Sequence, residues 1–519
     1  MALDHTVSYN PGTGEVLGQS KLNSVEEVIA AVAAAREAQQ AWASTPVKER
    51  SASLLKVRQY MVDAADELAD VIARDNGKTR TDAMVAEVVP ATLAVNYYCR
   101  KAASFLKDRR LWPGTWLLAN KASRIVRVPY GVVGIISPWN YPFSIPFSEV
   151  IMALVAGNAV ILKVASETQM AGRALERCLQ AADLPPGLFT HINMPGRQAG
   201  AAFLEAGVDK LFFTGSVAVG KTLMAQAAET LTPVVLELGG NDPMLVCEDA
   251  NIKRAVSGAV WGGMTNCGQT CGGVERIYVH RTVYEDFLDE LKQRVENLRI
   301  GYDTQYRTDL GAMTTTKQME KVQSQVEAAV GAGAVIYARS DPASDVDGNY
   351  LPAVVLTEVD HTMDVMRLET FGPVLGVMPV EDMEQAVVLA NDSDLGLTAS
   401  VWTTDAKAGA QLARRIKAGV VTINDHLVSH GLAETPWGGF KQSGIGRTHG
   451  ALGMAEMTQP QCIVHDYLSR ARRNMWWYPS GPAVYKGMRG LLDTLYGPKF
   501  LRRLMGLKHL LRIVPRMFW

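Results

Sequence analysis

The chain has 519 residues, 48% of them hydrophobic, which is enough to build more than one domain. Its 52 basic and 53 acidic side chains nearly cancel, so nothing marks the whole chain as a nucleic-acid binder. Six cysteines are too few for a disulfide framework, residues 1–15 show no secretory signal, and the longest uncharged apolar run, residues 150–162, is too short to span a bilayer. We therefore expect a soluble, cytoplasmic protein.

Helical patterns dominate the first 130 residues. Residues 10–19 predict a turn followed by a strand. Ser24 is placed to cap the next helix, with Glu27 completing a capping box. Apolar residues at three- and four-residue spacing predict further helix over residues 48–76 and 81–106, and residues 108–130 predict an exposed hairpin.

From residue 131 onward, short β-rich runs alternate with helical segments. This alternation predicts a parallel sheet with helices on both faces, and the pattern repeats after residue 251. We therefore expect an α/β protein with two successive domains of about 200 residues each. Because ligands of such sheets bind just outside the carboxyl ends of the strands, the residues that follow each strand are the candidates for function.

Three residues could carry chemistry, and two of them, Asn140 and Glu237, follow predicted strands. Cys271 lies among small residues in the segment WGGMTNCGQTCGGVER, which leaves its thiol accessible for nucleophilic attack, although a cysteine among glycines is often only a small buried hydrophobe. Asn140 follows a Pro-Trp turn, where its amide could donate to an oxyanion or simply complete the turn. Glu237 leaves a buried strand into a Gly-Gly turn, where it could serve as a general base or as a cap.

A competing motif lies at residues 215–222, GSVAVGKT, which satisfies the phosphate-loop pattern and follows a strand. With the apolar run ending at Glu237, it would indicate an NTPase that depends on Lys221. However, only about 15 residues separate the two pieces, which is tight for a crossover, and an NTPase gives no role to Cys271. The same residues also suit a glycine turn at a helix N-terminus that accepts a pyrophosphate.

Six segments occur in order that together resemble the aldehyde dehydrogenase superfamily: ISPWN, FTGS with a following glycine, LELGG, N-x-GQ-x-C, ETFGPV and PWGGFKQSGIGR. The likeness runs from about residue 8 to 465. It implies two Rossmann-like parallel-sheet domains, a β-hairpin oligomerisation element and a basic C-terminal tail. The implied bounds are 1–107 and 131–239 for the NAD(P)-binding domain, 240–437 for the catalytic domain, 108–130 and 450–468 for the oligomerisation element, and 469–519 for the extension.

The resemblance implies a role for each of the three candidate residues. The Cys271 thiolate adds to an aldehyde, the amide of Asn140 holds the oxyanion, and Glu237 activates the water that hydrolyses the resulting thioester. Tyr141 and Trp437 are expected to wall the aldehyde tunnel, and no metal is implied. The implied contacts with NAD or NADP are Ser137, Pro138, Trp139, Lys163, Ser166, Gly215, Ser216, Gly220, Leu238, Gly239, Glu369 and Phe371.

Three positions depart from the family pattern. Ser166 stands where NAD-preferring relatives often place a glutamate, so we expect NADP to be accepted, although Glu167 is adjacent. Thr448 stands where many relatives have a glutamate that assists the base. Cys267 lies four residues before Cys271, either as a core thiol or as the partner in a reversible disulfide.

The expected substrate is an apolar aldehyde, aliphatic or aromatic, because residues 141–150 and 425–434 contain no arginine for an acidic one. A semialdehyde dehydrogenase remains the alternative, and a catalytically inactive protein on this scaffold is the non-enzyme one. Residues 466–519 carry 11 Lys/Arg against two Asp. Within them, residues 499–514 predict a basic amphipathic helix that could lie on a membrane or dock on a subunit, since family members are usually dimers or tetramers.

Overall fold

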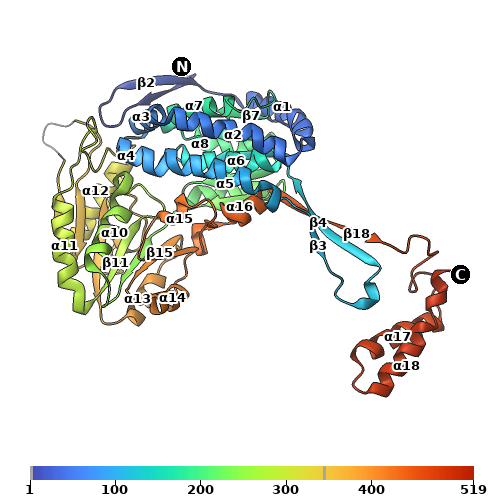
Figure 1. The fold of residues 1–519 in the computed structure, drawn as a ribbon. Coiled ribbons are helices and arrows are strands. Elements are labelled where there is room, and N and C mark those ends of the chain that lie inside the picture. Colours follow the sequence, from blue (N-terminus) through green and yellow to red (C-terminus); the bar gives the residue numbers. More distant parts are fainter. Residues whose placement is uncertain (1–3, 343–346) are drawn as a thin grey trace. The chain divides into compact units, whose positions relative to one another are not determined.

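The computed structural model describes residues 4–342 and 347–519 (Figure 1). It divides into two compact units, of which unit 1 comprises Met1–Leu106 and Val128–Gln459 and unit 2 comprises Lys107–Arg127 and Pro460–Trp519. Residues 450–459, expected in the oligomerisation element, belong to unit 1, because α16 (Gly450–Glu456) packs on α5 (Val89–Phe105) and α6 (Ser144–Ala156).

The N-terminal segment of unit 1 is largely helical. Ser24 and Glu27 form the predicted capping box at the start of α1 (Val25–Ser44). The helix predicted over residues 48–76 is divided at Ala64. The elements before α5 are β1 (His5–Tyr9), β2 (Val16–Lys21), α1, α2 (Val47–Asp63), α3 (Ala65–Asn76), α4 (Arg80–Ala83) and a π-helix over Met84–Val88.

The first sheet of unit 1 has the strand order β17-β9-β8-β5-β6-β7. Its five main strands are parallel, as predicted: β5 (Val132–Ile136), β6 (Ala159–Lys163), β7 (Phe189–Ile192), β8 (Lys210–Thr214) and β9 (Val234–Glu237). The register places Thr214 beside Glu237 at the carboxyl edge. The crossover helices are α6, α7 (Gln169–Gln180), α8 (Gly196–Glu205) and α9 (Val217–Ala228).

The second sheet has the order β12-β13-β14-β11-β10-β15-β16, and every neighbouring pair is parallel except β12 with β13. Its strands are β10 (Asp242–Val246), β11 (Val274–His280), β12 (Val335–Ser340), β13 (Ala353–Thr357), β14 (Val374–Val380), β15 (Thr398–Trp402) and β16 (Val420–Ile423). Its helices are α10 (Ile252–Met264), α11 (Tyr284–Glu296), α12 (Thr316–Gly331), α13 (Met383–Asn391), α14 (Ala406–Ala413) and α15 (Val428–Gly431).

A short return segment connects the two sheets. After β16 the chain reaches β17 (Gly444–Ile445), which pairs antiparallel with β9 of the first sheet. Gly444 is thereby opposite Glu237, so the segment PWGGFKQSGIGR fixes the end of the strand that carries this carboxyl group.

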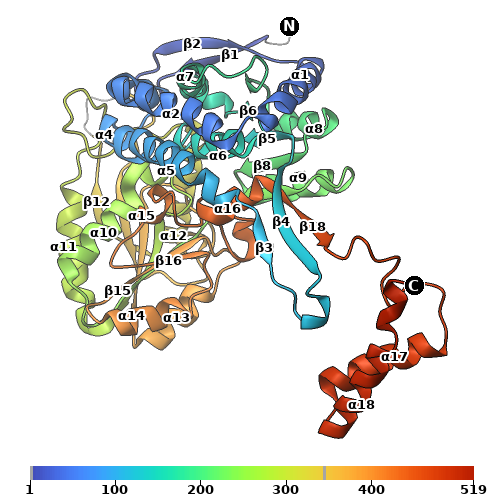
Figure 2. The same ribbon diagram turned by 45° about the vertical axis from the view of Figure 1, so that its right-hand side comes forward.

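Unit 2 combines a three-stranded sheet with a helical hairpin. The sheet order is β18-β4-β3, from Thr458–Asp466, Lys121–Pro129 and Arg109–Leu111. The helix predicted over residues 499–514 is present as α18 (Phe500–Leu511), and a second helix, α17 (Pro482–Tyr496), was not predicted. Figures 1 and 2 show the two helices side by side.

A fully buried ion pair lies beneath the carboxyl edge of the first sheet. The Lys78 ammonium donates to Glu87 at 2.6 Å and to the backbone carbonyl of Asn140 at 2.9 Å. The other Glu87 oxygen accepts the backbone N–H groups of Phe143 and Ser144 at the start of α6. Since Glu87 lies in the π-helix, that local distortion directs its carboxylate to this position.

We predict that Lys78→Met lowers the free energy of unfolding by about 3–5 kcal/mol, because it leaves the Glu87 carboxylate buried without a cation. The matched control is Lys56→Met, which removes an exposed pair with Asp183 and should cost less than about 1 kcal/mol. Urea denaturation of both variants measures the difference. Equal losses would contradict the role given to the buried pair.

Candidate active site

A left-handed turn over residues 266–268 positions Cys271. Asn266, Cys267 and Gly268 have φ values of 53°, 54° and 70°. A Cβ on Gly268 would lie 2.1 Å from the carbonyl of Gly372, so the turn has room only for glycine at that position. The chain then reverses and places Cys271 at the junction of two cavities.

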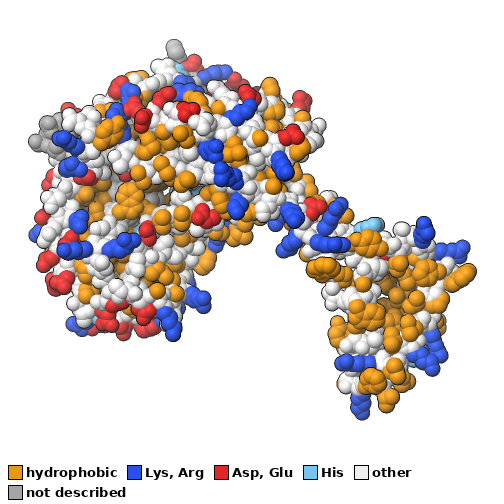
Figure 3. Space-filling view, in the orientation of Figure 1, with side chains coloured by type: hydrophobic (Ala, Val, Ile, Leu, Met, Phe, Trp, Pro, Cys, Tyr) orange, Lys and Arg blue, Asp and Glu red, His pale blue; other side chains and the backbone are white. Residues whose placement is uncertain are grey.

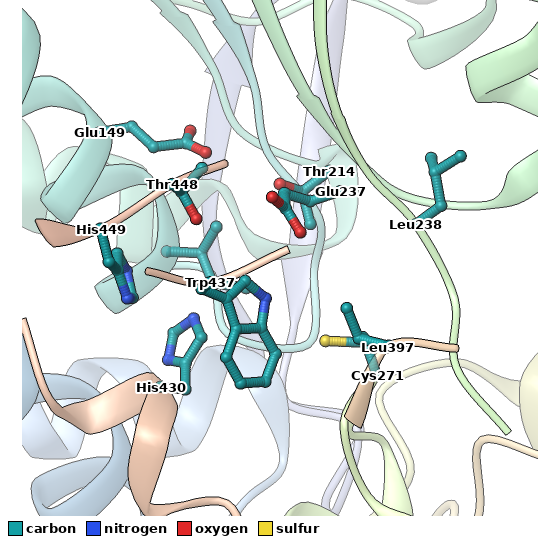
Figure 4. Close-up of a pocket in the computed structure, with 11 residues that line it drawn as sticks. Glu149, Thr214, Glu237, Leu238, Cys271, Leu397, His430, Trp437, Thr448 and His449 are labelled. Atoms are coloured by element: carbon teal, nitrogen blue, oxygen red, sulfur yellow. The ribbon is translucent and has the colours of Figure 1, made fainter. Parts of the chain in front are cut away.

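The smaller of the two cavities is lined by Cys271 and by several polar residues (Figure 4). The Cys271 sulfur and the Glu237 carboxyl group both point into it, from the second and first domains respectively. Both Glu237 oxygens are buried and have no hydrogen-bond partner among the described residues. Glu149, Thr448, His430 and His449 also line the cavity.

Burial sets the protonation of these groups. It raises the pKa of the Cys271 thiol, and the nearby carboxyl groups of Glu369, Asp242 and Glu237 raise it further. The pKa of Glu237 is raised well above its usual value by burial and by Glu149. Burial also raises the pKa of Glu149 to about 8. The thiol is therefore protonated at neutral pH and needs a base or a cationic neighbour before it can attack.

Asn140 connects the turn after strand β5 of the first sheet to the loop that carries Cys271. Its side-chain N–H donates to the Gln269 carbonyl at 2.9 Å, while its own backbone carbonyl accepts from Lys78 and from the Asn266 amide. An amide nitrogen carries two N–H groups, so one remains for an oxyanion. Asp82, which sequence reasoning missed, accepts the backbone N–H of Asn266 and so supports the same loop.

Several predicted cofactor residues gather beside this centre. A Cβ on Gly239 would lie 2.5 Å from the carboxylate of Glu369, which accepts the Gly240 N–H at 3.1 Å. Phe371 packs edge-on against Trp139, with ring centroids 5.5 Å apart. Glu369 and Phe371, which precede strand β14 of the second sheet, therefore contact the turns at the carboxyl edge of the first sheet. A dinucleotide binds at this edge in sheets of this type.

The remaining predicted cofactor residues follow β5, β6 and β8. Ser137 follows β5, and its hydroxyl is buried without a partner among the described residues, as is that of Thr214. Lys163 ends β6 and is buried, and Ser166 opens the next turn. Gly215 precedes Ser216, which caps α9, and Gly220 packs against Leu238. Buried hydroxyls without partners and a buried ammonium group fit a polar ligand such as NAD or NADP.

The phosphate-loop interpretation of residues 215–222 is wrong. Helix α9 already begins at Val217, so these residues form its first turns instead of a loop around a phosphate chain. Lys221 is exposed and donates to the side chain of Gln442 at 2.6 Å. The pattern therefore gives no support to an NTPase.

The larger of the two cavities has a volume of about 470 Å³ and is lined in part by Cys271, so it corresponds in position to the predicted aldehyde tunnel. Tyr141 hydrogen-bonds to Thr270 at 2.7 Å, and the Trp437 ring packs against Gly272, so both predicted wall residues adjoin the Cys271 loop. No Lys or Arg is among the described residues that line the tunnel. Its other walls include Val85, Val89, Pro90, Leu93, Ile145, Trp261, Leu427, Val428 and Leu432.

Cys267 takes no part in the cavities. It is 1% exposed and lies in the core of the second domain with Leu351, and both Cys267 and Cys271 are free thiols. Burial raises the pKa of Cys267 to about 12. This position favours the core-thiol interpretation over a redox partner.

Comparisons with known proteins agree with this geometry. The model of the aldehyde dehydrogenase family matches residues 2–463. A Methylomonas protein named 4,4'-diapolycopene aldehyde oxidase is 39% identical over 94% of this chain and 91% of its own. A Mycolicibacterium smegmatis protein, provisionally named succinate-semialdehyde dehydrogenase [NADP(+)], is 37% identical over 87% of each chain. The Bacillus cereus aldehyde dehydrogenase in complex with NAD+ is 33% identical with a TM-score of 0.84, covering 89% of this chain and 93% of that one.

The family match spans nearly the whole chain, and the fold is that of solved relatives. The chain therefore belongs to the aldehyde dehydrogenase family and is an oxidoreductase that works with NAD or NADP.

Proposed function

We propose that this enzyme oxidises apolar aldehydes to carboxylic acids through a thioester on Cys271. The observation that carries the proposal is the tunnel, which has apolar walls and ends at this thiol. Burial lowers the pKa of His426 and His430, which line the tunnel, to about 4, so both are neutral at pH 7. Asp425 adds only negative charge.

The first half of the proposed reaction builds a covalent bond to sulfur. Glu237, with both oxygens free of hydrogen bonds, accepts the thiol proton, and the Cys271 sulfur adds to the aldehyde carbon. The remaining N–H of Asn140 then donates to the new oxyanion. NAD or NADP, held beside the Gly239–Gly240 turn and Glu369, would supply the acceptor for the hydride that leaves this carbon.

The second half releases the product. Once Glu237 has released the thiol proton to solvent, water in the small cavity attacks the thioester on Cys271, and Glu237 takes up the water proton. The carbon–sulfur bond breaks, Glu237 returns its proton to the Cys271 sulfur, and the acid leaves. Thr448 offers only a hydroxyl near the base; burial, and after it the acidic neighbour Glu149, raises the pKa of Glu237.

The tunnel favours apolar aldehydes over semialdehydes. The carboxylate of a substrate such as succinate semialdehyde would lose its hydration in a tunnel whose described lining offers no cation. The relative named 4,4'-diapolycopene aldehyde oxidase supports an apolar aldehyde as the substrate. The relatives named for succinate semialdehyde represent the competing substrate class.

We also propose that the enzyme forms a homodimer or homotetramer through unit 2. Strand β18 is at the edge of its sheet, and most of its side chains are exposed. An exposed edge strand presents unpaired backbone groups, which a second copy can satisfy.

We predict that Cys271→Ala lowers kcat by at least about 10⁴-fold with alkanals, whereas the control Cys267→Ala stays within about threefold because that thiol is only packed.

For the wild type, kcat/KM should rise about fourfold for each added methylene until the tunnel is filled. It should also exceed the value for succinate semialdehyde by about 100-fold or more. Nicotinamide reduction at 340 nm measures the activity of each variant and of each substrate. A preference for the semialdehyde would refute the substrate assignment.

We predict that Glu149→Gln shifts the acid limb of the pH–rate profile to lower pH. The Glu149 carboxylate raises the pKa of Glu237, so its removal lets Glu237 lose its proton, and act as a base, at lower pH. Glu205→Gln makes the same charge change at an exposed position on α8 and should leave the profile unchanged. An unmoved limb in Glu149→Gln would show that the two carboxyl groups are not coupled.

We predict that Ser166→Glu raises the KM for NADP at least about tenfold and changes the KM for NAD less than threefold. A carboxylate at the end of β6 would repel a ribose phosphate, whereas the serine does not. Steady-state kinetics with both cofactors test this. A wild-type KM for NADP a hundredfold above that for NAD would contradict the role assigned to Ser166.

A further inference from the structure

The helical hairpin of unit 2, α17 and α18, is packed through glycines. A Cβ on Gly490 would lie 2.4 Å from the carbonyl of Gly506, and one on Gly487 would lie 2.5 Å from Ile513. The two backbones therefore approach closely, with few large side chains between them. Small residues at a helix–helix contact are typical of helices that pack in a lipid environment.

The large apolar side chains of the hairpin are mostly on its outside. Tyr496, Phe500, Leu501 and Met505 are 76%, 79%, 72% and 63% exposed, whereas α18 buries only Gly506 and Leu510. Figure 3 shows hydrophobic side chains covering much of the visible face of this hairpin, with Lys and Arg around them. A hairpin adapted to water would place such side chains between its helices, so this surface requires a covering partner.

The charge of the hairpin indicates an anionic partner. Residues 466–519 contain 11 Lys/Arg and two Asp. One of these acids, Asp493, is already paired with Arg489 and Arg502, at 3.1 and 2.7 Å. Lys499, Lys508 and Arg512 are exposed and make no ion pair within the part of the chain that the structure describes.

Aromatic residues flank this surface. Trp476, Trp477 and Tyr478 precede α17, and Trp519 ends the chain, all of them exposed. Tryptophan and tyrosine are favoured where apolar chains meet polar headgroups. In residues 4–342 and 347–519 no helix is long and apolar enough to cross a membrane. The hairpin could therefore only lie in the plane of a membrane surface.

We propose that the α17–α18 hairpin binds the surface of an anionic lipid membrane, with its exposed apolar side chains among the acyl chains and its basic side chains at the headgroups. The proposal concerns unit 2 alone, so its success or failure is independent of the reaction assigned to unit 1. A second copy of the chain is the competing occupant of the same face.

The test is co-sedimentation of the full-length protein with phosphatidylcholine vesicles, with and without 30% phosphatidylglycerol. The wild type should bind the anionic vesicles, and the triple change Leu501→Gln, Leu504→Gln and Met505→Gln should weaken binding at least about tenfold. The matched control replaces Val62, Leu231 and Val388, exposed on unit 1, by Gln and should bind as the wild type does. Alkanal oxidation by each variant verifies that unit 1 is folded.

A second variant separates charge from apolar burial. Lys499→Gln, Lys508→Gln and Arg512→Gln together should weaken binding to the anionic vesicles about fivefold for each charge removed, and added salt should weaken the wild type similarly. Failure of the wild type to bind anionic vesicles would overturn the proposal. So would an apolar variant that binds normally but dissociates in sedimentation equilibrium, because the face would then join two copies.

Discussion

One hydrogen bond holds the reacting centre together: the Asn140 amide donates to the Gln269 carbonyl at 2.9 Å and so joins the first domain to the Cys271 loop. The carbonyl of Asn140 is fixed in turn by the buried ammonium of Lys78. Since this ammonium also binds Glu87, whose other carboxylate oxygen accepts the Ser144 N–H at the start of α6, one network positions the proposed oxyanion donor, the tunnel wall and the proposed nucleophile together. A small displacement of a reacting group lowers the reaction rate by a large factor. This need for accurate positioning explains why the charged side chains of Lys78 and Glu87 are buried here.

The same burial decides the acid–base chemistry. Glu237 and Glu149 are buried and Glu369 is half-buried, and burial raises the pKa of each. Carboxyl groups with raised pKa values can exchange protons near neutral pH, where exposed ones stay ionised. Trp437 and the neutral histidines line the same cavities, so the proposed apolar substrate would share one site with these acid–base groups, and the described lining contains no permanent cation.

Much of the fold and of the site could be predicted from the sequence. The alternation after residue 131 follows from strand and helix periodicity, and Cys271, Glu237 and Asn140 follow from motifs with fixed order. Lys78 and Glu87 could not be predicted, because their pairing depends on a π-helix that leaves no local pattern. Glu149 could have been noticed as the one charge in an apolar helix. The phosphate-loop alternative stayed open in the sequence because the motif does not specify where α9 begins, and α17 was missed because its glycines resemble turn residues.

The most direct test of the account is a single-turnover experiment on Glu237→Gln. Mixed with an alkanal and an excess of NAD or NADP, this variant should reduce no more than about one equivalent of cofactor per site, and more slowly than the wild type, because Glu237 takes the proton in both halves of the proposed reaction. Mass spectrometry should find the acyl group on the peptide that contains Cys271. Continued turnover without a burst, or an acyl group on another residue, would contradict the division of roles between the two side chains.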